Sequence, residues 1–344
     1  MLCFSIAYIT YFTSLLSINI CILVATPILS IENLRAGFQI NGSFVEALRG
    51  IDLKISNGEI LALVGESGSG KTITGLSILN LMEPPAKISE GKILFNNENI
   101  LEYSEKKLLS YRGGQVSMIF QEPMTALNPV FTIGFQISEV LKTHTSLTKE
   151  EIAEKTIELL KTVGISEPEM RVKNYPFQLS GGMRQRAMIA MALASSPKLL
   201  IADEPTTALD VTIQAQILAL LKQLNRDKKM SILLVTHDLG VVSQIADKIA
   251  VMYGGCIMET GTVKNVLEKK KHPYTRGLLE SLPSAAVHKK GDKKLKPIVG
   301  QVPALTDMPD GCPFRGRCSL EKKECANDVP VKKAGKDHIY RCIH

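Results

Sequence analysis

Tryptophan is absent, aromatic residues make up only 5% of the 344 residues, and none of them interrupts the late lysine clusters at 269–271 and 289–296. These clusters carry much of the net charge of +7. Without interleaved aromatics they disfavour a nucleic-acid surface and favour a solvated linker or a segment near anionic lipid. We therefore expect no nucleic-acid partner. With 45% hydrophobic and 22% charged residues, the composition is that of a folded globular protein.

Charged side chains are also missing from the first 31 residues, since Glu32 is the first. The apolar stretch at residues 2–25 is long enough to cross a hydrocarbon core of ~30 Å. No Lys or Arg precedes it, which disfavours a cleaved secretory signal. Residues 1–27 are therefore interpreted as an apolar leader, either a membrane anchor or the product of a start codon assigned too far upstream.

After this leader, short apolar segments alternate with helical patterns, which predicts an α/β core with a largely parallel sheet covered by helices. The strand candidates are residues 51–55, 59–64, 199–202, 232–235 and 248–252, and the helix candidates are 72–81 and 213–224. Helical spacing within about 125–190 predicts a helical subdomain. Because the composition changes after about residue 265, we expect a main domain at 28–265 and a small extension at 266–344.

A glycine-rich segment follows the apolar strand candidate at 59–64 and fits the P-loop pattern G-x-x-x-x-G-K-[ST]. Glycines let backbone N–H groups converge on phosphate oxygens, and the following helix N-terminus favours an anion. Lys71 is expected to reach the β and γ phosphates, and the Thr72 hydroxyl to ligate Mg²⁺. The segment predicts an ATP site formed by Gly65, Glu66, Ser67, Gly68, Ser69, Gly70, Lys71 and Thr72.

Two adjacent carboxylates end the apolar strand candidate at 199–202. Ligands of parallel sheets bind at the carboxyl ends of the strands, so this position favours a site over a surface turn. Successive side chains on a strand point to opposite sides. We therefore expect Asp203 to face Mg²⁺ and Glu204 to contact the attacking water.

A Ser-Gly-Gly turn precedes the helix expected at 183–194, and its free N–H groups form a second anion site. One domain holds one triphosphate, so the second cradle implies a second nucleotide. Residues 179–186 closely resemble the signature of ABC ATPases, in which two domains meet head to tail and each signature helix caps the ATP on the other's P-loop. The resemblance implies ATP contacts from Ser180, Gly181, Gly182 and Gln185.

The resemblance extends to several single positions. Gln121 resembles the Q-loop glutamine, which senses Mg²⁺ and contacts the membrane subunit, and Asp210 resembles the D-loop aspartate. His237 resembles the switch histidine at the γ-phosphate. With Gln121, Glu204 and His237 as catalytic residues, hydrolysis would proceed by positioning and charge neutralisation. Phe38 is preferred over Phe44 as the aromatic that stacks on adenine, and either could equally belong to the core.

The branch of the family is indicated by residues 121–129, by Met183 in the signature and by residues 272–275, which read His-Pro-Tyr-Thr. Together they resemble importers of oligopeptides, dipeptides and nickel, and methionine at 183 is typical of the D-type ATPase subunit. The resemblance covers about residues 30–344. It implies ATP-driven import of peptide, with nickel as the alternative cargo.

Such a subunit implies partners. These are two transmembrane permeases, a second ATPase subunit (F-type, or a second copy) and an extracellular substrate-binding protein, with this chain peripheral at the cytoplasmic face of the membrane. Two competing classes remain. The signature disfavours a P-loop kinase or GTPase, and the single P-loop disfavours a soluble ABC ATPase acting on DNA or ribosomes, which would usually carry tandem cassettes or a long coiled coil.

Four of the seven cysteines gather in the last 33 residues of a Pro-, Gly- and Lys-rich tail that could hardly build a core unaided. Disulfides are disfavoured among reduced cytosolic thiols, and clustered thiolates then favour a metal site. The absence of any C-x2-C pair weakens the zinc-ribbon interpretation, so a [4Fe-4S] cluster is preferred over structural Zn²⁺. Four free buried thiols remain the third alternative. The candidates are Cys312, Cys318, Cys325 and Cys342.

Overall fold

The structure is a computed structural model that describes residues 26–207, 209–281 and 297–344. The predicted leader at 1–27 therefore lies almost entirely outside the described residues, as do the lysines at 289–296. Among the helices in the described ranges, none combines the length and the apolarity that crossing a membrane requires.

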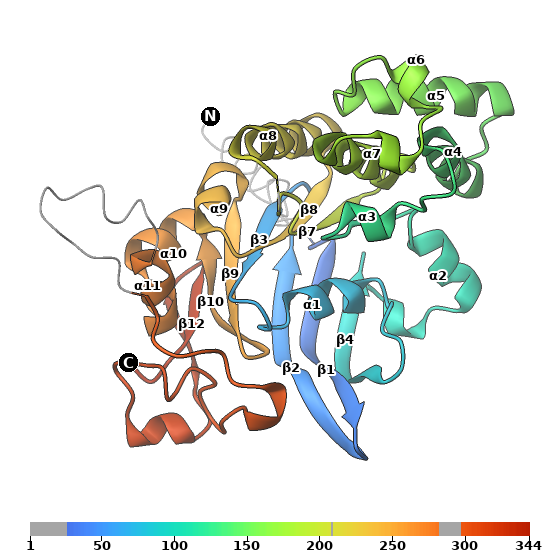
Figure 1. The fold of residues 1–344 in the computed structure, drawn as a ribbon. Coiled ribbons are helices and arrows are strands. Elements are labelled where there is room, and N and C mark those ends of the chain that lie inside the picture. Colours follow the sequence, from blue (N-terminus) through green and yellow to red (C-terminus); the bar gives the residue numbers. More distant parts are fainter. Residues whose placement is uncertain (1–25, 208, 282–296) are drawn as a thin grey trace, which may run out of the picture.

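A mixed sheet with the strand order β11-β12-β10-β9-β3-β8-β7-β6 lies at the centre of the described chain (Figure 1). Its middle strands pair in parallel and are buried on both faces, as expected for apolar runs covered on two sides. The parallel strands are β3 (Ile60–Val64), β6 (Val116–Ile119), β7 (Leu199–Asp203), β8 (Ser231–Thr236) and β9 (Lys248–Tyr253).

Alternation along these strands divides the apolar side chains between two cores. Leu200 and Ala202 of β7 face the core formed with α7 (Gly181–Leu193) and α8 (Val211–Lys228). Leu199 and Ile201 of the same strand face the opposite core, which contains the end of α1 (Lys71–Ile78). The sheet is thus fixed between helices on one side and α1 with a second sheet on the other.

That second sheet was not predicted. It is antiparallel, with the order β2-β1-β4-β5, and the strand expected at 51–55 is only the end of its long strand β2. The alternating pattern of a half-buried strand is weaker than the continuous apolar run of a buried parallel strand, so its length was missed. Its strands are β1 (Leu29–Ile40), β2 (Ser43–Ile55), β4 (Ala86–Phe95) and β5 (Glu98–Asn99).

Short helices follow β6 and gather at one end of the molecule, beside α7 (Figure 1). Thr132 and Thr148 cap two of them, and Thr148 forms a capping box with Glu151. These helices are α3 (Pro123–Ala126), α4 (Ile133–His144), α5 (Lys149–Thr162) and α6 (Pro168–Arg171), while α2 (Glu105–Tyr111) precedes β6 and α9 (Leu239–Ile245) follows β8.

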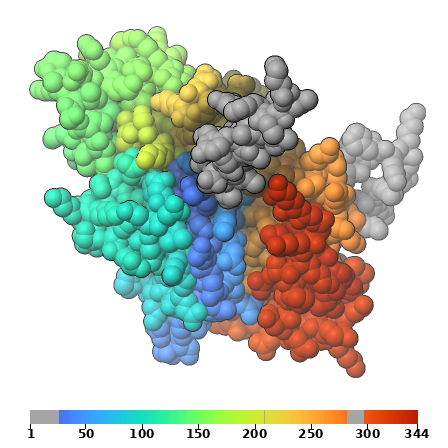
Figure 2. Space-filling view, turned by 180° about the vertical axis from the view of Figure 1, so that it is seen from behind, coloured from blue at the N-terminus to red at the C-terminus, as the bar shows by residue number. Residues whose placement is uncertain are grey.

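The C-terminal residues extend the central sheet. β12 (His338–Arg341) pairs antiparallel with β10 (Cys256–Thr262), and β11 (Val331–Gly335) adds the edge. Between them lie α10 (Val263–Lys269) and α11 (Pro273–Glu280). Seen from behind, this red region lies beside the blue strands (Figure 2), consistent with the Arg49 guanidinium donating to the Pro309 carbonyl at 3.4 Å.

A buried carboxylate joins the parts of this region. Glu259 of β10 is fully buried, and its oxygens accept the N–H groups of Lys271 and His272 at 2.8 Å each. His338 of β12 lies 2.7 Å from the same carboxylate through Nε2. A buried charge requires such partners, so Glu259 fixes the start of α11 against the strand pair β10-β12.

Candidate nucleotide-binding and hydrolysis site

The predicted P-loop connects β3 to α1, as its pattern requires. Gly70, the residue before the helix, has φ of 105°, which favours glycine. At Gly65, a Cβ atom would lie 2.1 Å from the Met252 carbonyl oxygen, so the loop lies against the end of β9. Gly70 therefore permits the tight turn before α1, and Gly65 permits the close approach of the loop backbone to β9.

Lys71 is only 6% exposed and donates through Nζ to the carbonyls of Gly65 at 2.9 Å and Glu66 at 3.0 Å. Burial lowers the pKa of Lys71, while the carboxylates of Glu204, Asp203 and Glu66 act in the opposite direction. The Lys71 ammonium is thus bound by two backbone carbonyls of the loop, and a phosphate oxygen could replace either of them as acceptor.

Burial raises the pKa of Asp203, and the nearby Thr72 hydroxyl acts in the opposite direction by hydrogen bonding to the carboxylate. Asp203 is 2% exposed and its Oδ1 atom has no hydrogen-bond partner within the described chain. A hydroxyl and a buried carboxylate oxygen without a donor fit a hard cation such as Mg²⁺. The Gln121 amide, a further predicted Mg²⁺ ligand, donates to Glu204.

The two other predicted catalytic side chains, Gln121 and His237, both lie against the Glu204 carboxylate. This carboxylate accepts the Gln121 amide at 3.3 Å, and His237 lies at 3.3 Å through Nδ1. Thr207, which the sequence did not single out, donates its hydroxyl at 2.8 Å. Glu204 also has φ of 46°, a conformation rare outside glycine that turns the chain at the end of β7. Three segments far apart in sequence therefore converge on one carboxylate.

The Ser-Gly-Gly turn opens α7 as predicted. Ser180 is the N-cap, and its hydroxyl accepts the Met183 N–H at 3.3 Å. A Cβ atom at Gly181 would meet no atom within 4 Å, so the turn is open to an approaching group. Figure 1 shows α7 well away from α1, so the turn does not lie over the P-loop of its own chain.

Gln185, which was predicted to contact ATP, is 2% exposed and donates to the Pro205 carbonyl at 2.7 Å. This bond ties α7 to the loop that follows Glu204. The predicted contact with ATP stays a prediction.

The remaining predicted contacts are Asp210 and one of two phenylalanines. Asp210 is the N-cap of α8 and accepts the Ile213 N–H at 2.9 Å. Phe38 and Phe44 lie near the β1-β2 hairpin, both half-buried, and Lys87 lies over the Phe44 ring at 5.2 Å. These observations do not test which ring stacks on adenine, so the preference for Phe38 stays a prediction.

The four C-terminal cysteines lie around one small cavity, together with His272 and Arg315. All four are free, and burial raises the pKa of Cys312 to about 11 and that of Cys318 in the same direction. Among the described residues, no three His, Cys, Asp or Glu side chains are arranged to hold a metal ion. The structure therefore confirms that the thiols gather and does not support the iron-sulfur or zinc prediction.

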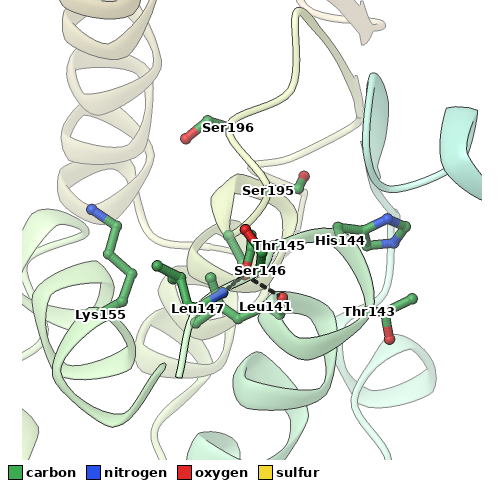
Figure 3. A pocket seen from close by; sticks show the side chains of 10 residues that line it. Leu141, Thr143, His144, Thr145, Ser146, Leu147, Lys155, Ser195 and Ser196 are labelled. Carbon is green, nitrogen blue, oxygen red and sulfur yellow. Dashed lines mark hydrogen bonds between the residues drawn. The ribbon is translucent and has the colours of Figure 1, made fainter. Parts of the chain in front are cut away.

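A separate hollow of about 570 Å³ lies at the end of α4, beside residues 194–196. Figure 3 shows Lys155 and His144 on opposite sides of it, with Ser195 and Ser196 at its margin. It shares no residue with the P-loop or the α7 turn, and its polar groups do not converge on a common point. We assign it no part in nucleotide binding.

The fold and site define a P-loop ATPase of the ABC class. Residues 48–207 match the ABC transporter family, and residues 258–325 match the oligopeptide/dipeptide transporter C-terminal region. The chain belongs to the family of ATP-binding subunits of oligopeptide and dipeptide ABC transporters, because curated members align over most of both sequences.

Among these relatives, the dipeptide transport ATP-binding protein DppD of Bacillus subtilis is 47% identical, over 92% of this chain and 94% of its own. The oligopeptide transport ATP-binding protein OppD of the same organism is 48% identical, over 92% and 88%. A solved dimeric structure of MJ0796, a bacterial ABC transporter cassette, is 29% identical with a TM-score of 0.61, over 68% of this chain and 98% of its own. These likenesses confirm the predicted ABC ATPase fold.

Proposed function

We propose that this chain hydrolyses ATP to power import of di- or oligopeptides through a membrane ABC transporter, with nickel as the alternative cargo. The observation that carries the ATPase part is the convergence of Gln121 and His237 on Glu204, beside the Thr72–Asp203 pair. The peptide branch is supported by the C-terminal match and by the printed functions of the relatives.

In this proposal Lys71 would exchange the Gly65 and Glu66 carbonyls for the terminal phosphates, and Thr72 and Asp203 would hold Mg²⁺. Bound Mg²⁺ would neutralise charge between the phosphates. Glu204 would orient the attacking water, His237 would contact the γ-phosphate, and Gln121 would sense whether Mg²⁺ is bound. Positioning and charge account for catalysis, since no covalent intermediate is required.

We infer a second cassette, because α7, which begins at the Ser180–Gly182 turn, lies apart from α1, which follows the P-loop (Figure 1). MJ0796, which has the same fold, is described as a dimer. We propose a head-to-tail pair with an F-type subunit or a second copy of this chain. Each α7 turn would then cap the nucleotide on the other P-loop with its free N–H groups.

We further propose that the helices after Gln121 dock the two permease subunits. Two stacked aromatic pairs are exposed here, Phe131–Phe135 and Tyr175–Phe177. The Ile133 N–H donates to the Asn174 carbonyl at 2.9 Å, so the pairs lie on adjoining segments. Clustered exposed aromatics are typical of protein interfaces, and their link to Gln121 through α3 connects the docked permease to the catalytic carboxylate.

Phe135→Glu is expected to reduce copurification of the permeases by about tenfold or more, because a charge replaces an interface aromatic. Binding of ATP should stay unchanged, since Phe135 lies outside the nucleotide site. Leu109→Glu is the matched control, because Leu109 is an exposed apolar residue on α2, 66% accessible. Equal permease recovery with both variants would contradict the docking proposal.

The cargo is tested by uptake in cells that lack the chromosomal copy of this chain and carry it on a plasmid. We expect the plasmid to restore uptake of labelled di- or oligopeptides, which requires permeases at the membrane and an external binding protein. Restoration of nickel uptake alone would replace peptide with nickel as the cargo. Recovery of ribosomes or DNA with the chain, in place of permeases, would contradict a transporter role.

We retain as a proposal that Cys312, Cys318, Cys325 and Cys342 hold a [4Fe-4S] cluster, with Zn²⁺ as the alternative. Its support is that all four thiols line one cavity. Anaerobically purified chain should contain about four iron atoms, and Cys312→Ser should lose them. One equivalent of zinc would show that the site binds Zn²⁺ instead. A metal-free chain would contradict both metals and indicate four free thiols that pack as small apolar groups.

A further inference from the structure

The C-terminal region reaches the P-loop directly through Glu66, the second residue of the loop. The guanidinium of Arg317 donates through Nη1 to both Glu66 oxygens, at 3.0 and 3.2 Å. Their side chains are 7% and 28% exposed, so this is a largely buried ion pair. It joins two residues 251 positions apart in the sequence.

Arg317 is held in place on every side. It donates to the Val299 carbonyl at 3.0 Å, the Gly300 carbonyl at 2.9 Å and the Tyr253 hydroxyl at 3.2 Å. All three guanidinium nitrogens thereby donate hydrogen bonds, and the charge is presented to Glu66 in one orientation. Such a fixed guanidinium can constrain its partner in a way that a mobile surface charge cannot.

A second contact fixes the backbone of the same residue. The Glu66 N–H donates to the Tyr274 hydroxyl at 2.9 Å, and Tyr274 is fully buried in the His-Pro-Tyr-Thr segment. The Tyr274 N–H donates to His272 Nδ1 at 3.0 Å, and its ring packs edge-on against Tyr253 at 4.8 Å between centroids. Phe314, three residues before Arg317, completes this aromatic cluster.

Glu66 thus has all three of its polar groups occupied, because its carbonyl accepts from Lys71 at 3.0 Å. Its carboxylate acts on the Lys71 ammonium, and it would also repel a triphosphate on the loop. Pairing with Arg317 offsets that repulsion and turns the carboxylate toward the C-terminal region. When Lys71 moves to phosphate, Arg317 and Tyr274 still hold the carboxylate and the N–H of Glu66, while the Ser69 N–H still donates to its carbonyl at 3.2 Å.

The structure assigns Arg317 and Tyr274 as positioning residues that hold Glu66 so that the P-loop accepts ATP. This inference rests on the proposed nucleotide site and adds to it a role for the C-terminal region. ATP affinity in this chain then depends on residues about 200 and 250 positions after the loop, outside the segment that matches the general ABC transporter family.

The test is titration of the full chain with the fluorescent nucleotide mant-ATP and Mg²⁺. Arg317→Gln is expected to raise the Kd about tenfold, because it leaves an unpaired carboxylate beside the phosphates. Tyr274→Phe removes one hydroxyl and should raise the Kd about threefold. Arg276→Gln, which removes an exposed charge from α11, is the matched control and should leave the Kd unchanged.

A double-mutant cycle separates positioning from mere loss of structure. If Arg317 acts through the Glu66 carboxylate, Arg317→Gln should raise the Kd about tenfold in the wild-type chain but less than about threefold in a Glu66→Gln chain. An equal rise in Kd in both backgrounds, or an Arg317→Gln chain that binds like wild type, would overturn the inference. A wild-type chain that binds no mant-ATP would instead overturn the proposed function.

Discussion

ATP turnover should fall by about 10²- to 10³-fold in Glu204→Gln, while ATP binding is retained. Glutamine keeps the shape of the side chain, and its amide oxygen can still accept hydrogen bonds from Thr207 and Gln121, which lie 2.8 and 3.3 Å from the carboxylate. It cannot accept a proton from water as a carboxylate can. The measurement is phosphate release by the assembled complex at saturating MgATP, beside a mant-ATP titration of the same preparation.

Glu268→Gln is the control for this change, since it neutralises an exposed carboxylate on α10. It should turn over like wild type. If Glu204→Gln hydrolyses ATP at the wild-type rate, then Glu204 does not act on the attacking water. Loss of both binding and turnover would indicate that the variant disturbs the Lys71 environment, because Glu204 is among the charges that act on that ammonium.

Lys71→Met is expected to weaken ATP binding by about 100-fold, equivalent to ~2.7 kcal/mol. Methionine fills a similar volume at this 6% exposed position but supplies no charge to the terminal phosphates. Loss of the lysine also removes a cation that opposes the rise in the pKa of Asp203 caused by burial.

Lys149→Met, at the exposed start of α5, is the matched control. Thermal unfolding of both variants checks that the fold is intact. Undiminished mant-ATP affinity in Lys71→Met would show that the glycine-rich loop binds phosphate through its backbone alone, and the assigned role of Lys71 would be wrong.

Much of the site follows from sequence because its chemistry is local. The P-loop pattern specifies a strand, a tight turn and a helix within a few residues, and β3, Gly70 and α1 follow that order. The buried strand before Asp203 is equally clear, because a continuous apolar run needs no distant partner to be recognised. These segments were predicted with nearly their observed bounds.

Other features depend on tertiary contacts, which no local pattern encodes. The resemblance to the ABC signature places Gln185 among the ATP contacts, and only the fold shows that its amide donates to the Pro205 carbonyl. Thr207 and Arg317 stand in unremarkable sequence, and only the fold brings them to Glu204 and Glu66. The alternation in β1 and β2 was too weak to predict the second sheet.

The C-terminal region illustrates the same limit. Its change of composition suggested a separate extension, yet β12 completes the central sheet beside β10, and Tyr274 packs in one core with Tyr253. Composition indicates how exposed a segment is to solvent. It does not indicate that β12 pairs with β10, a strand some 80 residues earlier in the chain. The extension and the ATPase core therefore share both a sheet and the contacts at Glu66.

The central claim is that hydrolysis at Glu204 powers import. Its most direct test is simultaneous measurement of phosphate release and labelled-peptide uptake by proteoliposomes that contain this chain, its permeases and its partner cassette, with ATP on the cassette side and binding protein on the other. We predict uptake that requires ATP and is lost, together with most phosphate release, in Glu204→Gln. Equal peptide uptake by wild type and Glu204→Gln would contradict the account.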